Sequence, residues 1–159
     1  MPIAMSTNSR FSQNRGKMGR PRMMSAVALV AFAGVIVSSV SLYQHFATSK
    51  TSFCDFGESF NCDLVNRSAY STFLGVPVAL IGMFGYLLII ALATVYRSKA
   101  ETPILLLLAS HLGLAFSLYL TYVEQFVLRT WCVLCLTSLG LIFTLAILSV
   151  VLVRTSARQ

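Results

Sequence analysis

The chain has 159 residues, of which 57% are hydrophobic and only 11% are charged, and its mean hydropathy is +0.78. Soluble domains carry about a quarter charged residues, so this composition excludes a sizeable aqueous domain and indicates one membrane-embedded unit. The net charge of +7 would suggest nucleic-acid binding in a soluble protein. Here the basic residues gather between and beyond the hydrophobic runs, where they report membrane orientation instead.

Residues 1–24 are basic, lack acids and show no hydrophobic periodicity, so we expect a disordered cytoplasmic tail. The same composition is also typical of an organellar transit peptide. Four hydrophobic runs follow, each near the ~20 residues that cross a bilayer. They cover about Ser25–Ala47, Phe73–Tyr96, Pro103–Val123 and Trp131–Val153, and none contains Lys, Arg, Asp or Glu. Because apolar helices satisfy their own backbone groups in lipid, we predict an all-α membrane protein. We expect a four-transmembrane-helix bundle over residues 25–153, with a cysteine-containing outer loop, and a cytoplasmic tail over residues 154–159.

The charged residues predict the orientation of this bundle. Basic residues predominate in the N-terminal tail, in the loop between the second and third runs, and in the C-terminal tail: Arg10, Arg15, Lys17, Arg20, Arg22, Arg97, Lys99, Arg154 and Arg158. The other two connections mix both signs: Lys50, Arg67 and Arg129 with Asp55, Glu58, Asp63 and Glu124. The positive-inside rule therefore predicts cytoplasmic termini. It puts both mixed loops and all four cysteines on the extracytoplasmic side, where disulfides persist.

Cys132 and Cys135 open the fourth run as Cys-Val-Leu-Cys. At positions i and i+3 of a helix they share a face, and Cα atoms about 5–6 Å apart suit a disulfide. The free amides and the dipole of a helix N-terminus favour a thiolate. Cys135 lies one turn deeper, by roughly 4.5 Å, and faces any apolar cofactor held between helices. Zinc would need two further ligands, so we interpret the pair as a redox centre, with a metal site or an inert motif as the alternatives.

Cys54 and Cys62 lie in the long polar loop of about residues 48–72, and long connections are often functional. A disulfide that closes so short a loop stabilises by only roughly 2–3 kcal/mol in the chain-entropy model. We therefore favour a shuttle pair that exchanges with the CxxC cysteines over a static bridge. Asp55 would raise the pKa of the Cys54 thiol if the two are close, or it is loop surface.

The polar and small residues after this loop suggest a pocket. A short interfacial helix is expected between Cys62 and Ser71, and Ser68 on it is a capping or surface residue when judged from the residues alone. Gly75, Pro77 and Gly82 loosen the outer half of the second run and leave room for a ligand between helices.

In this order the motifs resemble the vitamin K epoxide reductase family in its bacterial, stand-alone four-helix form. The resemblance covers about residues 25–153. It rests on Cys54-Asp55 followed after seven residues by Cys62, then Val65 and Ser68, Gly75-Val76-Pro77, Ser117-Leu118-Tyr119-Leu120, Phe126-Val127-Leu128, and Cys132-Val133-Leu134-Cys135.

The resemblance implies a role for each cysteine. Cys135 would react with a quinone of the ubiquinone, menaquinone or phylloquinone type, and Cys132 would be its partner. Cys62 would form a transient bridge to Cys132, and Cys54 would exchange with a separate thioredoxin-like (DsbA-type) redox protein. Ser68 would belong to the site. The implied activity is thiol–quinone oxidoreduction that supports disulfide formation outside the cytoplasm of a bacterium, with no metal and no nucleic-acid partner.

Two positions of the expected cofactor site differ from the vertebrate members. Val78 and Leu139 stand where those proteins have Asn and Tyr, which are thought to hold the ring oxygens of vitamin K. Reduction of vitamin K epoxide is therefore an alternative rather than the primary expectation. A non-catalytic membrane scaffold with structural disulfides is the alternative from another class, and it predicts fully oxidised cysteines that are indifferent to quinone.

Overall fold

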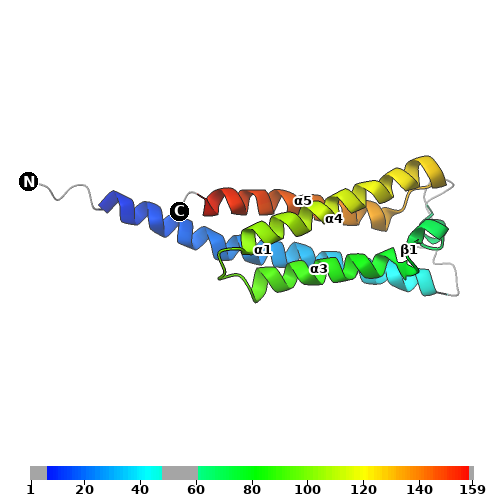
Figure 1. Cartoon of the computed structure of the whole chain (residues 1–159), viewed down its shortest axis with the longest axis horizontal. Coiled ribbons are helices and arrows are strands. Elements are labelled where there is room, and N and C mark those ends of the chain that lie inside the picture. Colours follow the sequence, from blue (N-terminus) through cyan, green and yellow to red (C-terminus); the bar gives the residue numbers. More distant parts are fainter. Residues whose placement is uncertain (1–6, 48–60, 158–159) are drawn as a thin grey trace, which may run out of the picture.

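The computed structural model describes residues 7–47 and 61–157, which form a bundle of long helices (Figure 1). The long helices are α1 (Thr7–Phe46), α3 (Val78–Thr94), α4 (Thr102–Val123) and α5 (Val133–Ser156). Helix α1 packs along α3 and α5, and α4 packs along α5 and α3. One end of the bundle holds the end of α5 and the α3–α4 connection, and the other end holds the short elements that precede α3 (Figure 1).

Three helical stretches among the described residues are long and apolar enough to cross a membrane: Pro21–Phe46, Thr102–Leu128 and Val133–Ser156. The remaining apolar helix is α3, which has 17 residues. The predicted helical membrane architecture is therefore confirmed for three spans, while the second run forms a shorter helix than the predicted Phe73–Tyr96.

The late start of α3 has a local cause. Strands β1 (Thr72–Phe73) and β2 (Val76–Pro77) pair antiparallel before the helix begins. The turn between them has φ 53° at Leu74 and φ 82° at Gly75, and positive φ at both central residues is the geometry that closes a tight hairpin. Pro77 then occupies the N-cap of α3. Because this segment is apolar, its composition predicts a continuous helix and gives no indication of the hairpin.

The chain ends also differ from the predicted tails. Helix α1 begins at Thr7, so residues 7–24 are helical where we expected disorder. Arg, Gln, Lys and Met recur in this stretch and favour helix, whereas each Gly in it costs about 1 kcal/mol relative to Ala. Pro21 lies inside the helix, and the Ser25 hydroxyl donates to its carbonyl at 3.0 Å. At the other end α5 continues to Ser156, beyond the predicted boundary at Val153.

Apolar contacts and a few hydrogen bonds join the long helices. All four contribute to one buried cluster, which includes Met24, Val27, Ala31, Tyr86, Ile89, Leu106, Ile142, Leu145 and Leu152. The hydroxyls of Ser110 in α4 and Ser149 in α5 lie 2.8 Å apart in a buried contact. Small polar residues of this kind let transmembrane helices approach closely and hydrogen-bond across the interface.

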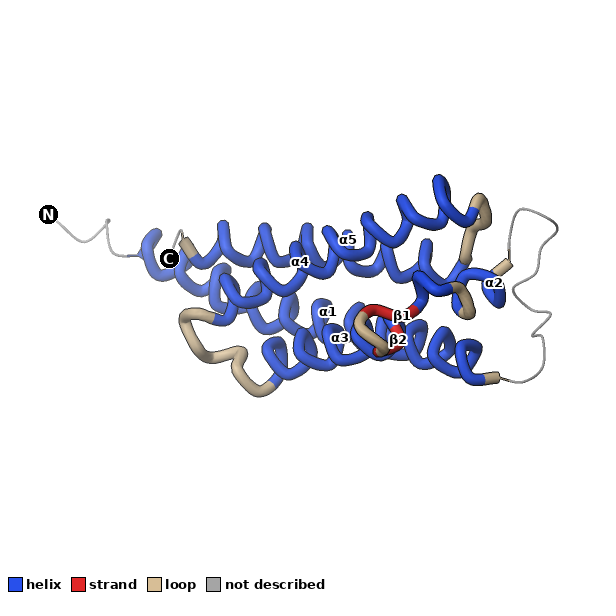
Figure 2. Tube along the Cα trace, turned by 45° about the vertical axis from the view of Figure 1, so that its right-hand side comes forward, coloured by secondary structure: helices blue, strands red, loops and turns tan. Residues whose placement is uncertain are grey.

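A short helical cap lies over the end of the bundle where α5 begins (Figure 2). It consists of α2 (Cys62–Asn66) and the 3-10 turn η2 (Ala69–Ser71), which confirms the predicted short helix after Cys62. Asn61 caps α2, because its side-chain oxygen accepts a hydrogen bond from the amide of Leu64 at 2.8 Å.

Candidate redox site

Three of the four cysteines meet at the end of the bundle that carries α2. Cys62 and Cys132 are both fully buried, and together with Val65 they form a small cluster against which Cys135 packs. The amide of Asn61 donates to the carbonyl of Trp131 at 3.1 Å, so the residues that precede the two cysteines are joined directly. Cys62 is disulfide-bonded, whereas Cys132 and Cys135 are free thiols. The expected site residues Cys54 and Asp55 lie outside the described residues.

The N-terminus of α5 sets the environment of Cys132. The helix begins at Val133, so Cys132 is its N-cap in extended conformation rather than a residue of the first turn, and Cys135 lies in that turn. The pKa of Cys132 is lowered, first by a hydrogen bond from the Cys135 thiol and further by the backbone amides of Cys135 and Leu134. Burial and the charge of Glu124 oppose this effect. The arrangement favours a Cys132 thiolate, which is the reactive form in thiol exchange.

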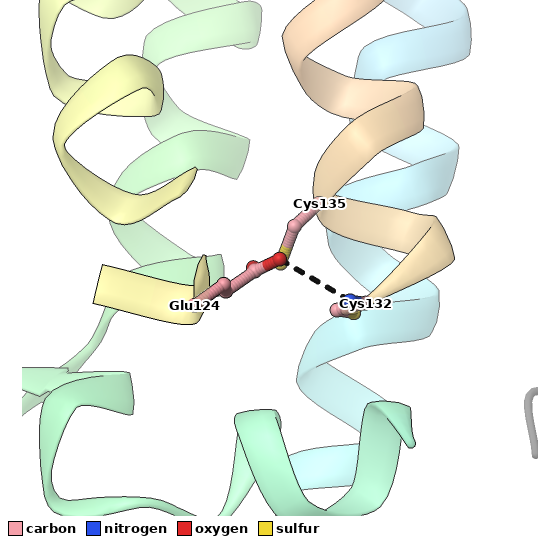
Figure 3. Close-up of side chains that lie close together, drawn as sticks. All are labelled: Glu124, Cys132 and Cys135. Atoms are coloured by element: carbon pink, nitrogen blue, oxygen red, sulfur yellow. Dashed lines mark hydrogen bonds between the residues drawn. The ribbon is translucent and has the colours of Figure 1, made fainter. Parts of the chain in front are cut away.

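Glu124 completes the group around the CxxC pair. It is 2% exposed, and its carboxylate accepts a hydrogen bond from the amide of Cys132 at 3.2 Å. The Cys135 thiol also hydrogen-bonds to it. One carboxylate oxygen and the two sulfurs lie within 4.8 Å of one another. Figure 3 shows the side chain of Glu124 reaching from the end of α4 to the start of α5.

A π-helical turn places this carboxylate. The turn η3 (Glu124–Leu128) continues α4, and it closes at Arg129 in a left-handed conformation. The amides of Arg129 and Thr130 both donate to the carbonyl of Glu124. Short π-helical segments occur frequently at functional sites because the wider turn redirects side chains.

A cavity of about 400 Å³ lies between the helices directly inside this group. Its lining is mostly apolar, and residues of all four long helices and of the cap contribute. Cys135 and Glu124 both face it, whereas Cys132 does not line it. The two thiols therefore have different neighbours: Cys132 packs with Cys62 of the cap, and Cys135 opens to the apolar cavity.

Two of the other predicted cofactor-site residues line the same cavity. Ser68 faces it from the cap, and its hydroxyl donates to the carbonyl of Val65 at 2.8 Å. Val78 faces it from the start of α3. Leu139 is half-buried on α5 and is not among the lining residues.

The residue pattern now has a match among known protein families. The model of the vitamin K epoxide reductase family matches residues 25–150. The chain belongs to this family. Members of the vitamin K epoxide reductase family are oxidoreductases, and the long apolar helices agree with an integral membrane protein. The matched residues include Cys62, Cys132 and Cys135 and the helices around the cavity, so the family resemblance expected from the motifs is confirmed.

Glu124 is the residue of this site that the sequence analysis did not single out. The third predicted run ends at Val123, which assigns Glu124 to the charges of the following loop. The apolar residues Phe126, Val127 and Leu128 continue beyond it, and the helical stretch runs to Leu128. A lone acid within an apolar stretch was the available signal, since ionisable residues inside membrane helices usually mark function.

The same three groups lie close enough together to bind a metal ion. Structural zinc sites have four protein ligands, and among the described residues this cluster offers three. A metal would also engage both thiols and prevent exchange with Cys62. In a family of oxidoreductases we therefore interpret the cluster as a redox centre.

Proposed function

We propose that this protein is a membrane thiol–quinone oxidoreductase that supports disulfide formation outside the cytoplasm. One observation carries the proposal: Cys135 opens to a mostly apolar cavity of about 400 Å³, while Cys132, beside it, packs against the disulfide-bonded Cys62. The first contact suits a lipid-soluble electron acceptor, and the second suits thiol exchange with the cap.

The proposed electron path begins at an extracytoplasmic thioredoxin-like protein, which reduces the pair Cys54 and Cys62. The Cys62 thiolate attacks Cys132 in a Cys132–Cys135 disulfide, and Cys135 leaves as a thiolate. Cys54 then attacks Cys62, which frees Cys132 and restores the outer disulfide. A disulfide-bonded Cys62 beside free Cys132 and Cys135 is the state expected after this transfer, and it supports the proposal.

The electron acceptor in this proposal is a quinone, which enters as a substrate. The reduced pair Cys132 and Cys135 gives it two electrons, the quinone takes up two protons, and the disulfide between the two cysteines forms again. The apolar walls of the cavity would hold the ring and exclude water, and Ser68 offers a hydroxyl at the outer wall. Four membrane-spanning helices with cytoplasmic termini belong to the same proposal, because 17 residues of α3 reach about 26 Å, close to the thickness of a bilayer core.

Two other functions are separated from this one by specific residues. The family description favours reduction of vitamin K epoxide as the second candidate, but Val78 contributes an apolar side chain to the cavity. A scaffold with passive disulfides would be expected to have oxidised cysteines, whereas Cys132 and Cys135 are free.

The test is quinone reduction by purified protein with a dithiol donor, compared between wild type, Cys135→Ala and Thr144→Ala. We expect turnover in the wild type and loss to background in Cys135→Ala, because the thiol that faces the acceptor is gone. Thr144 is exposed on α5, and within the described part of the chain its hydroxyl hydrogen-bonds only to the carbonyl of Gly140, so its variant should keep full turnover. Assays with vitamin K epoxide in place of quinone test the second candidate. Undiminished quinone turnover in Cys135→Ala would refute the proposal.

A further inference from the structure

Glu124 has no role in the exchange steps above, although its carboxylate contacts both residues of the CxxC pair. Its carboxylate is buried, and its polar contacts within the described residues are the amide of Cys132 and the thiol of Cys135. A carboxylate inside a membrane bundle is costly when no cation pairs with it. A merely structural link to the Cys132 amide could be made by a neutral side chain at lower cost.

The position of Glu124 matches a requirement of the proposed chemistry. Glu124 and Cys135 both line the apolar cavity, so one carboxylate lies beside both the thiol and the space assigned to the acceptor. Reduction of a quinone consumes two protons, and the walls of this cavity are mostly apolar. The other titratable groups that line it are His45 of α1, Tyr70 of the cap and Tyr86 of α3, and Tyr70 is 49% exposed. The Tyr86 hydroxyl forms a hydrogen bond with the Ser138 hydroxyl, and Nδ1 of His45 contacts the carbonyl oxygen of Asn66.

We infer that Glu124 is the proton carrier of the redox site, accepting the proton of the Cys135 thiol and passing it to a quinone oxygen. This inference rests on the proposed function. In the step it describes, the S–H bond of Cys135 breaks and an O–H bond forms on Glu124. That proton then moves to the quinone oxygen as the electrons of the reduced pair reduce the ring. Because Cys132 is already a thiolate, the second proton of the quinol is taken up from water. The disulfide then forms, and Glu124 is again a carboxylate.

The inference predicts two effects of Glu124→Gln in opposite directions. General acid–base catalysis contributes about 100-fold or more to a rate, so quinone turnover near neutral pH should fall by about that factor. The deficit should narrow as pH rises, because hydroxide then removes the thiol proton without Glu124. In quinone-free, reduced protein, Cys135 should instead be alkylated at lower pH in Glu124→Gln than in wild type, because a neighbouring negative charge has been removed and the thiolate forms more easily.

This pair of measurements separates proton transfer from the alternative roles. A carboxylate that acted only through its charge would hinder thiolate formation, and Glu124→Gln would then raise turnover. A purely structural link would give a loss that is uniform with pH and an unchanged alkylation profile. Either result overturns the inference. Alkylation is followed at the Cys135 peptide by mass spectrometry, so this readout does not depend on quinone.

Two further variants keep the test interpretable. Glu124→Asp retains a carboxylate and should recover most of the lost turnover. This variant therefore still tests the inference if Glu124→Gln folds poorly. Gln125→Ala changes the neighbouring residue of the same π turn, whose side chain is exposed, and should behave as wild type in both measurements. If wild-type protein does not reduce quinone, the proposed function fails and this inference fails with it. If wild type turns over and Glu124→Gln equals it, only the inference fails.

Discussion

Gly34 of α1 provides the space that the ring of Tyr86 in α3 occupies. A Cβ atom at this position would overlap the ring, and the ring itself is only 4% exposed. The hydroxyl of Tyr86 donates to the carbonyl of Ser138 in α5 at 3.0 Å. One aromatic side chain therefore joins three helices, and the joint lies beside the cavity that Tyr86 also lines.

Gly34→Ala should destabilise the folded protein by about 1–3 kcal/mol, the usual cost of overpacking a filled interior. The measurement is thermal unfolding in detergent. The matched control is Gly140→Ala in α5, where an added Cβ meets nothing within 4 Å and helix propensity should leave stability equal or slightly higher. Equal melting temperatures for Gly34→Ala and wild type would mean that α1 and α3 pack differently at this point.

At the residue scale, the sequence predicted the cysteines of the site and missed its acid. Cys62, Cys132 and Cys135 were identified because thiol spacing carries chemical meaning along the chain itself. Glu124 depends on where α4 ends, and that end is decided by the π turn and by the left-handed Arg129. Neither feature has a reliable signature in a single sequence, so the contact between Glu124 and Cys135 could only be found in three dimensions.

The buried side chain of Asn66 hydrogen-bonds the cap element α2 to α1, and His45 of α1 also contacts the Asn66 carbonyl. The Asn66 amide donates to Gln44 at 3.0 Å and accepts from the hydroxyl of Ser41 at 2.7 Å. Asn66 is 6% exposed and Gln44 is fully buried. Because α2 has only five residues, its own backbone hydrogen bonds give it little stability, and its place above the CxxC pair depends on this tertiary contact.

Asn66→Ala should therefore loosen the cap without unfolding the bundle. Loss of a buried partner costs about 1–3 kcal/mol, so amide hydrogen exchange over residues 62–71 should accelerate by about tenfold for each 1.4 kcal/mol lost. Exchange in α4 and α5 should stay unchanged, and so should exchange of the cap in Thr144→Ala. A uniform acceleration throughout the protein would show that Asn66 stabilises the whole fold rather than the docking of α2.

Element boundaries were predictable where apolar composition alone decides them. The end of α1, the start of α4 and the body of α5 lie within a few residues of the expected limits. The start of α3 does not, because Leu74 and Gly75 form a turn and Pro77 occupies the N-cap position of the helix within the apolar run. Hydropathy measures transfer into lipid. It carries no information about backbone turns, so it did not predict the hairpin before α3. It also does not predict helices in polar segments, so it did not predict the extension of α1.

At the scale of the whole molecule, the two ends of the bundle differ in chemistry. The described cysteines lie at the end that carries α2. At the other end the basic residues Arg97 and Lys99 follow α3, and Arg154 lies in the last turn of α5 (Figure 1). The positive-inside rule then relates the cysteine end to the extracytoplasmic side, as proposed above. The cavity extends inward from the thiols, so in the proposed function exchange with an external protein and reduction of a lipid-soluble acceptor would take place on opposite sides of the CxxC pair.

This division of roles predicts a trapped intermediate in Cys135→Ala. With Cys135 absent, the Cys132 thiolate can attack Cys62 and displace the cysteine bonded to it, which leaves a Cys62–Cys132 disulfide. Cys135 can no longer attack this bridge, so its resolution is left to the displaced cysteine and the bridged form should accumulate. The pKa of wild-type Cys132 is lowered chiefly by the Cys135 thiol. In the variant that pKa should rise, so the thiolate fraction near neutral pH should fall and trapping should accelerate as the pH increases.

Peptide mapping by mass spectrometry under non-reducing conditions measures this linkage. Cys132→Ala serves as the matched control, because it removes the attacking thiol and should give no bridge to Cys62 at any pH. The buried contact of Cys62 with Cys132 and the hydrogen bond between Asn61 and Trp131 leave little freedom for another pairing. A disulfide from Cys132 to a different cysteine would therefore contradict both the packing of the cap and the electron path that depends on it.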